Sequence, residues 1–143
     1  MVKDILDGIS IKLNQVFGSG YEIYGDTDVV QGLQTPCFFI AVLQPSQEQM
    51  IGNRYFRQYP FDISFFPTQG GDNVECYEVA EDLLDEMEAI TLVNGDVLRG
   101  TKMQYEIVDD VLHFKVNYNM FTKKIETSDA METVEIDSNV PIT

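Results

Sequence analysis

Residues 52–67, GNRYFRQYPFDISFFP, decide how the rest of the chain folds. This stretch holds six of the sixteen Phe and Tyr residues, and from Phe61 onward its side chains alternate between two faces. The residues that share the apolar face are Phe61, Ile63 and Phe65. Alternation with a period of two predicts a strand over residues 54–66 that buries one face in a core.

A second apolar strand precedes this stretch. Pro36 begins the run at residues 37–43, CFFIAVL, which is apolar on both faces and therefore predicts a central, covered strand. We expect the two strands to pair antiparallel, with the polar residues 44–53 as a loop between them. Pro60 has no amide hydrogen for the ladder, so it predicts a bulge or an edge at that point.

Two amphipathic helices flank these strands. Residues 3–17 place apolar side chains at three- and four-residue spacing, and Gly18-Ser19-Gly20 ends that helix. Residues 74–90 predict the second helix, with Asn73 as its N-cap. One face of the second helix is apolar. The other face is entirely acidic and carries Glu75, Glu78, Glu81, Asp82, Asp85, Glu86 and Glu88.

The remaining strands are expected at residues 21–24 and in the second half of the chain. Asn94-Gly95 predicts a hairpin between residues 92–93 and 97–98, because that dipeptide accepts positive φ. Residues 101–108 and 111–121 alternate around the turn Asp109-Asp110. The last strand has an apolar face with Leu112, Phe114, Val116, Tyr118 and Met120. Its polar face has His113, Lys115, Asn117 and Asn119, and that face is expected to meet solvent or a partner.

These elements predict an α+β fold, with a mixed or mainly antiparallel sheet packed against two main helices. Residues 1–122 are expected to form one compact domain, and residues 123–143 an acidic C-terminal tail or arm. Within that segment, residues 133–136 are suited to a sheet edge. A chain of 143 residues can bury a sufficient core without a disulfide or a metal.

The charge of the chain excludes several classes of partner. There are 24 acidic and 9 basic residues, which give a formal net charge of −15. This balance opposes binding to nucleic-acid phosphates and to anionic membranes, but it suits a surface that DNA passes without sticking. No apolar run reaches the length of a membrane span, and no signal peptide is visible, so synthesis in the cytoplasm is expected. We expect Cys37 and Cys76 to be buried free thiols; a disulfide or a reactive thiol is the alternative.

No catalytic or metal site is indicated. His113 is the only histidine, so any Ser-His or Cys-His arrangement would have to include it. No acid or nucleophile near it in the sequence marks it as catalytic, and nucleotide, hydrolase and redox motifs are absent. The acidic helix has carboxylates at i,i+4 spacing, but it lacks the histidines or the Asp-Gly loop of a dedicated metal site. These residues do not exclude an enzyme, but they nominate no nucleophile, base and oxyanion donor together.

Charged and aromatic residues instead indicate an interface. Arg54 and Arg57 are basic in an acidic chain, and they could pair with acids of the same subunit or of the next subunit around a ring. The candidate interface residues are Arg54, Tyr55, Arg57, Glu78, Asp82, Asp85, His113 and Lys115.

Several spaced blocks of sequence resemble one known family. The blocks are QGLQTPCFFI, GNRYFRQYPFDISFFP, ECYEVAEDLLDEME and RGTKMQYEIVDDVLHFKVNYNMF, within residues 5–121. In this order they resemble the small tail terminator proteins of phages, prophages and phage-tail-like particles, mostly contractile ones. The C-terminal residues 122–143 have no counterpart in this resemblance.

The resemblance implies a structural role without catalysis or cofactor. It implies a compact domain that forms a hexameric ring on the last ring of the tail tube and stops polymerisation. The implied partners are further copies of the chain, the tail tube protein, the sheath protein and the head connector, with DNA only as passing cargo and no membrane. The implied locations are the cytoplasm of the bacterial host during assembly and then the virion tail or tail-like particle.

Two alternatives stay open. One is a head–tail joining or completion protein of the same particle, which would have a similar size. The other is a small enzyme or acidic regulator outside any particle. A clustered pocket around His113 with perturbed carboxylates would support it, and a flat, ring-packed surface would oppose it.

Overall fold

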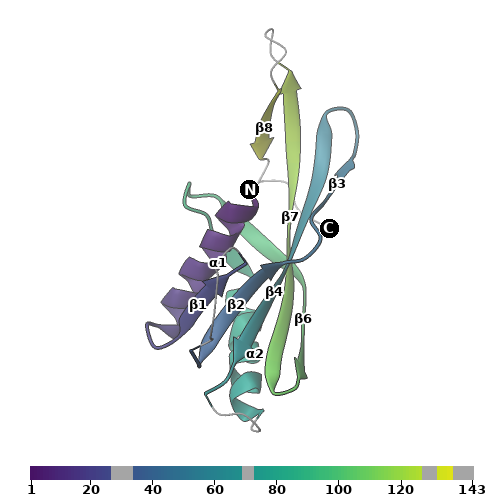
Figure 1. Cartoon of the computed structure of the whole chain (residues 1–143). Coiled ribbons are helices and arrows are strands. Elements are labelled where there is room, and N and C mark those ends of the chain that lie inside the picture. The colour runs from purple at the N-terminus through teal and green to yellow at the C-terminus, as the bar shows by residue number, and fades with distance from the viewer. Residues whose placement is uncertain (27–33, 69–72, 127–131, 137–143) are drawn as a thin grey trace.

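The computed structural model describes residues 1–26, 34–68, 73–126 and 132–136. Two helices and eight strands follow one another along these residues (Figure 1). They are α1 (Val2–Phe17), β1 (Glu22–Gly25), β2 (Cys37–Val42), β3 (Ser46–Gln49), β4 (Arg54–Phe66), α2 (Val74–Glu86), β5 (Ala89–Thr91), β6 (Val97–Val108), β7 (Val111–Glu126) and β8 (Glu132–Ile136).

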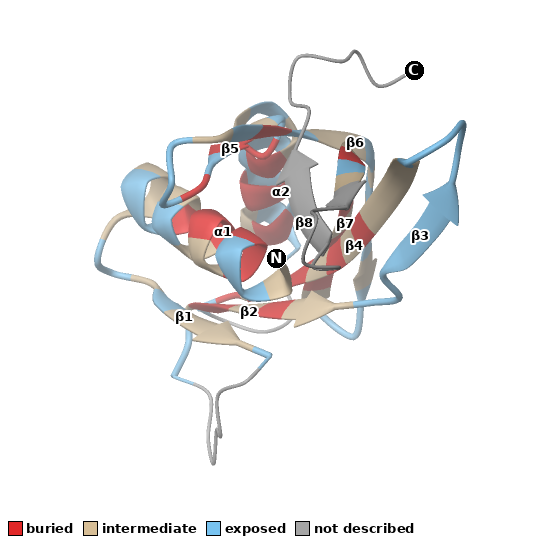
Figure 2. Cartoon of the chain, turned by 90° about the horizontal axis from the view of Figure 1, so that it is seen from above, coloured by how far each residue is buried: buried red, intermediate tan, exposed pale blue. Residues whose placement is uncertain are grey.

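All eight strands join one mixed sheet. The order across it is β1-β2-β4-β7-β6-β5, while β3 pairs with β4 and β8 pairs with β7. Only the pairing of β1 with β2 is parallel; the others are antiparallel. Seen from above, the sheet curls around α1 and α2, which pack on its inner face (Figure 2). The predicted α+β fold is therefore confirmed.

The centre of the molecule is the long pair β4–β7. Their register runs without a break from Arg54 opposite Lys123 to Phe65 opposite Leu112. The apolar faces predicted for both strands are confirmed, because Phe61, Phe114 and Tyr118 are fully buried. The helices complete this core with buried side chains such as Ile5, Ile9, Leu13, Val79 and Leu83.

The two central strands extend beyond the helices and form a projecting arm. We use the name "arm" for β3, residues 54–58 of β4, residues 119–126 of β7, and β8. β3 flanks β4 from Ser46 opposite Gln58, and β8 flanks the end of β7 (Figure 1). The arm exists because each long strand has a helix-covered partner at one end and a short hairpin partner at the other.

Pro60 lies where β4 changes partner from β2 to β3, and the predicted bulge there is wrong. The β4–β7 register passes Pro60 without a shift. The Pro60 carbonyl accepts a hydrogen bond from the Leu43 amide at 2.9 Å, so this residue faces the interval between β2 and β3. The Pro60 nitrogen points to the same side as its carbonyl, so the missing amide hydrogen costs no bond of the β4–β7 ladder. The bulge of the sheet lies instead in β6, between Thr101 and Gln104, where Lys102 has a φ of 52°.

Other boundaries also differ from the prediction. Residues 44–53 are not all loop, because Ser46–Gln49 form β3. α2 ends at Glu86 rather than at residue 90, and Ala89–Thr91 form β5. Asn73 occupies the N-cap without a side-chain hydrogen bond. The Asn94-Gly95 hairpin is present, with Gly95 at a φ of 96°.

The C-terminal segment begins inside a strand. β7 continues to Glu126 rather than ending at residue 121, and the edge strand suited to residues 133–136 is present as β8. Residues 127–131 and 137–143 of this segment lie outside the described residues, as do parts of the connections at 25–35 and 67–72. The division of the chain at residue 122 and the role of residues 123–143 as an arm or tail stay predictions.

Candidate functional site

The structure separates the eight candidate interface residues into three surfaces. Arg54, Tyr55 and Arg57 lie on β4 within the arm. Glu78, Asp82 and Asp85 lie on the outer side of α2 and are exposed. His113 and Lys115 lie on β7, on the side of the sheet that faces away from the helices, which we call the open face. No single site contains all eight.

Aromatic rings hold the basic residues of the arm. The Arg54 guanidinium lies 5.4 Å from the centre of the Phe121 ring, and the Lys124 ammonium lies 4.4 Å from the centre of the Tyr55 ring. Phe121 also packs against Phe56, with ring centres 5.0 Å apart. Cation–π contacts of this kind stabilise a charged group beside an apolar surface. Arg54 and Lys124 of the arm thus each lie against an aromatic ring.

Arg57 is held by β3. Its Nε donates a hydrogen bond of 2.6 Å to Oε1 of Gln47, the residue opposite it in the β3–β4 register. Within the described residues, Arg57 forms no ion pair with a carboxylate. β3 therefore positions the guanidinium of Arg57 through an uncharged side chain.

The β3–β4 turn carries an apolar tip that the sequence analysis missed. Met50 is 48% exposed and Ile51 is 88% exposed, in a turn where Gly52 has a φ of 65°. The two apolar residues directly before Gly52-Asn53 could have indicated this tip. Because no strand was predicted at the position of β3, these two residues were assigned to a loop. The tip exposes apolar surface beside the cations of β4.

The outer face of α2 is acidic with one aromatic contact. Tyr77 is 51% exposed and packs edge-to-face on Tyr105, with ring centres 6.4 Å apart. The Tyr105 hydroxyl donates to Oε1 of Glu81 at 3.4 Å. Loss of solvent around the ring, together with the negative charge of Glu81, raises the pKa of Tyr105. Elsewhere on the helix, Lys12 pairs with Glu86 at 3.6 Å.

On the open face, three polar residues meet around one imidazole nitrogen. His113 Nδ1 lies 3.3 Å from Oδ2 of Asp62 and 3.2 Å from Oγ of Ser64. In a Ser-His-Asp triad the acid and the serine bind opposite nitrogens, so that the ring takes the serine proton on one nitrogen while the acid orients it through the other. Here both bind the same nitrogen. The group therefore lacks the geometry for proton relay and acts as a hydrogen-bonded link between β4 and β7.

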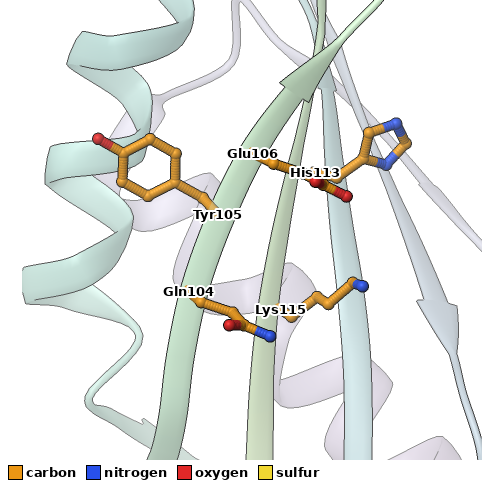
Figure 3. Close-up of a pocket in the computed structure, with 5 residues that line it drawn as sticks. All are labelled: Gln104, Tyr105, Glu106, His113 and Lys115. Atoms are coloured by element: carbon orange, nitrogen blue, oxygen red, sulfur yellow. The ribbon is translucent and has the colours of Figure 1, made fainter.

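A small pocket of about 130 Å³ lies next to this link (Figure 3). Its lining residues are Gln104, Tyr105, Glu106, His113 and Lys115. In Figure 3 the Tyr105 ring points toward α2, while the other four side chains project on the opposite side of the sheet. The pocket thus brings Glu106, His113 and Lys115 together on one side of the sheet.

Further along β7, the polar face is less exposed than predicted. Asn117 and Asn119 are only 7% and 5% exposed. Their amide groups donate at 3.1 Å to Oε1 of Gln58 and to Oγ1 of Thr101. The polar side chains of the neighbouring strands β4 and β6 thus lie against these asparagines. The expectation that this face meets solvent or a partner is therefore wrong for Asn117 and Asn119.

The cysteines and the acidic clusters add no further chemistry. Cys37 and Cys76 are free and buried, as predicted, and burial raises the pKa of the Cys37 thiol. In the part of the chain that the structure describes, no group of three His, Cys, Asp or Glu is arranged to hold a metal ion. No helix among the same residues is both long and apolar enough to cross a membrane.

Comparison with known proteins identifies a family. A family model described as "Phage tail terminator protein" matches residues 4–130. No curated protein matches the chain.

Proposed function

Because this chain belongs to the phage tail terminator protein family, we propose that it caps the tail tube and stops the tube from growing. The observation that carries this proposal is the family match, which spans residues 4–130 and so includes both helices and the β4–β7 pair. The name of the family describes a structural role in the tail and no reaction. We accordingly assign the chain a structural role.

The finer parts of the proposal concern its partners. We propose that the chain forms a ring, a hexamer on the tail, which sits on the last ring of tube protein and offers its other side to the head connector. In a contractile particle the same ring would also meet the sheath. The net charge of −15 supports passage of DNA without binding, because like charges repel.

The surfaces described above support contact with partners more than chemistry. The arm offers cations and an apolar tip, and α2 offers carboxylates. The enzyme alternative has a small pocket beside His113 in its favour, but the Asp62–Ser64–His113 group lacks the arrangement of a catalytic triad. The second alternative, a head–tail joining role, would use the same kinds of surface.

Tail length tests the proposal. Particles made without this protein should have overlong tubes of variable length by electron microscopy, and the wild-type protein supplied in trans should restore the normal length. Tails of normal length in its absence would contradict the terminator role. If such tails were accompanied by unattached heads, the joining role would replace it.

A further inference from the structure

The β3–β4 hairpin combines exposed apolar side chains with basic ones. Its tip exposes Met50 and Ile51, and its second strand carries Arg54 and Arg57 in a chain with only 9 basic residues. The hairpin projects from the body beyond the helices (Figure 1). Exposed apolar surface beside cations fits a partner surface with apolar groups beside carboxylates.

The outer face of α2 has that composition. Tyr77, Glu81 and Asp85 follow one line at i,i+4 spacing, and Glu78 and Asp82 follow the adjacent line. Tyr77 is 51% exposed, and the four acids are also exposed. The described part of α2 contains no lysine or arginine to neutralise them.

The two surfaces lie at opposite ends of the molecule, so one copy cannot join its own hairpin to its own α2 (Figure 1). We propose that the β3–β4 hairpin of one copy packs on the outer face of α2 of the next copy, head to tail. Ile51 lies against the Tyr77 region, and Arg57 faces the carboxylates of Glu78 and Asp82. This contact deepens the proposed function and rests on it, because it is the contact by which copies assemble at the tail end.

The choice of the β3–β4 side of the arm follows from its tip and from Arg57. Met50 and Ile51 are exposed at the tip. Arg57 donates a hydrogen bond to the uncharged Gln47, which positions the guanidinium without neutralising it. Arg57 therefore keeps its positive charge for a neighbouring subunit.

Cross-linking in assembled tails tests the contact. The double variant Ile51→Cys with Asp82→Cys should give a ladder of cross-linked species larger than dimers when tails are treated with a short bis-maleimide. The native Cys37 and Cys76 are 0% exposed, so they provide little background. The matched control is Ile51→Cys with Lys3→Cys, since the Lys3 side chain is 86% exposed but lies on α1.

Three results would overturn the proposal. They are the absence of cross-links, equal cross-linking in the control, and a product that stops at dimers. The last would indicate antiparallel pairs instead of a head-to-tail series. If the cysteine variant gives tails of normal length but no cross-linked ladder forms, this contact is wrong while the proposed function stands. If deletion leaves tail length normal, the proposed function fails whatever the cross-links show.

Charge reversal gives an independent test that does not depend on a reagent. Arg57→Glu or Asp82→Arg alone should reduce the amount of protein retained on washed tails by about tenfold, because each places like charges together. The two changes in one chain should restore retention. Failure of the combined variant to recover, although circular dichroism shows it folded, would refute the pairing.

Discussion

Replacing Tyr118 with phenylalanine removes one hydroxyl from the centre of the core. Tyr118 is 0% exposed, and its hydroxyl donates a 2.9 Å hydrogen bond to the backbone carbonyl of Met87, the residue that caps α2. This bond ties the end of the helix to the central strand β7. The substitution keeps the ring, so its effect reports the hydroxyl and not a cavity.

The magnitude follows from burial. A buried carbonyl that loses its donor cannot regain a hydrogen bond from water, and this costs about 1–3 kcal/mol of unfolding free energy. We expect a loss of about 2 kcal/mol at neutral pH, which corresponds to a fall in Tm of about 8 °C for a chain of this size.

Alkaline pH provides a second measure of the same group. Burial raises the pKa of Tyr118 above its ordinary value of about 10. The folded state therefore binds this proton more tightly than the unfolded state does. The resulting stability is present below the unfolded pKa and is lost as the pH rises above it toward the folded pKa. By pH 11 the wild type should have lost about 1 kcal/mol of unfolding free energy from this group, and the phenylalanine variant none. The difference in unfolding free energy between the two proteins should therefore narrow to about half of its value at pH 7.

Urea unfolding at pH 7 and at pH 11, followed by circular dichroism, checks both values. Tyr105→Phe is the control at pH 7, because its hydroxyl lies at an exposed contact with Glu81; it should cost less than about 0.5 kcal/mol. Two results would refute the reasoning. One is a loss of unfolding free energy in Tyr118→Phe as small as that in the control, and the other is a difference between wild type and Tyr118→Phe that does not narrow at pH 11.

Three further substitutions test the backbone and the faces of the strands. Gly100→Ala should lower the free energy of unfolding in urea by at least about 2 kcal/mol, because a Cβ there would lie 2.5 Å from a backbone carbonyl oxygen. The control Gly20→Ala should be nearly neutral, because a Cβ there would have nothing within 4 Å. Equal effects of the two substitutions would contradict this packing. Asp110→Gly should raise the free energy of unfolding by about 0.5–1 kcal/mol and Tm by a few degrees. Asp110 has a φ of 64° in the β6–β7 turn, which glycine adopts without strain. A lower Tm would contradict that turn. Phe114→Ala should cost about 3–5 kcal/mol, and His113→Ala less than about 1 kcal/mol, since the two lie on opposite faces of β7. A reversed order would show that the faces are misassigned.

Much of the fold could be predicted, because apolar and polar side chains alternate clearly in strands that bury only one face. The alternation of β4 and β7 identified Phe61, Phe114 and Tyr118 as core, and all three are fully buried. The strand β3 was missed because its four residues, SQEQ, are all exposed and carry no apolar alternation. It is a strand only because β4 extends beyond β2 and offers unpaired backbone groups.

The candidate interface residues were predictable as residue types but not as surfaces. The small number of basic residues singled out Arg57. The helical spacing of Glu78 and Asp82 placed their side chains together on one face of the second helix. The sequence contained no measure of distance between the two, and it did not indicate that Ile51 projects at the same end as Arg57. The burial of Asn117 was also unpredictable, because it involves Gln58, a side chain of the strand β4 that is far away in the sequence.

The sequence alone therefore determined the class of fold, the identity of the core strands and helices, and the family resemblance, because each of these depends on local periodicity and on ordered blocks. Only the tertiary structure decided that β4 and β7 continue into an arm, that the arm and α2 lie at opposite ends, and that Asp62 and Ser64 share one nitrogen of His113. These features depend on pairing between segments far apart in the chain. Local pattern carries no information on such pairing, since the backbone groups that pair are the same in every residue but proline.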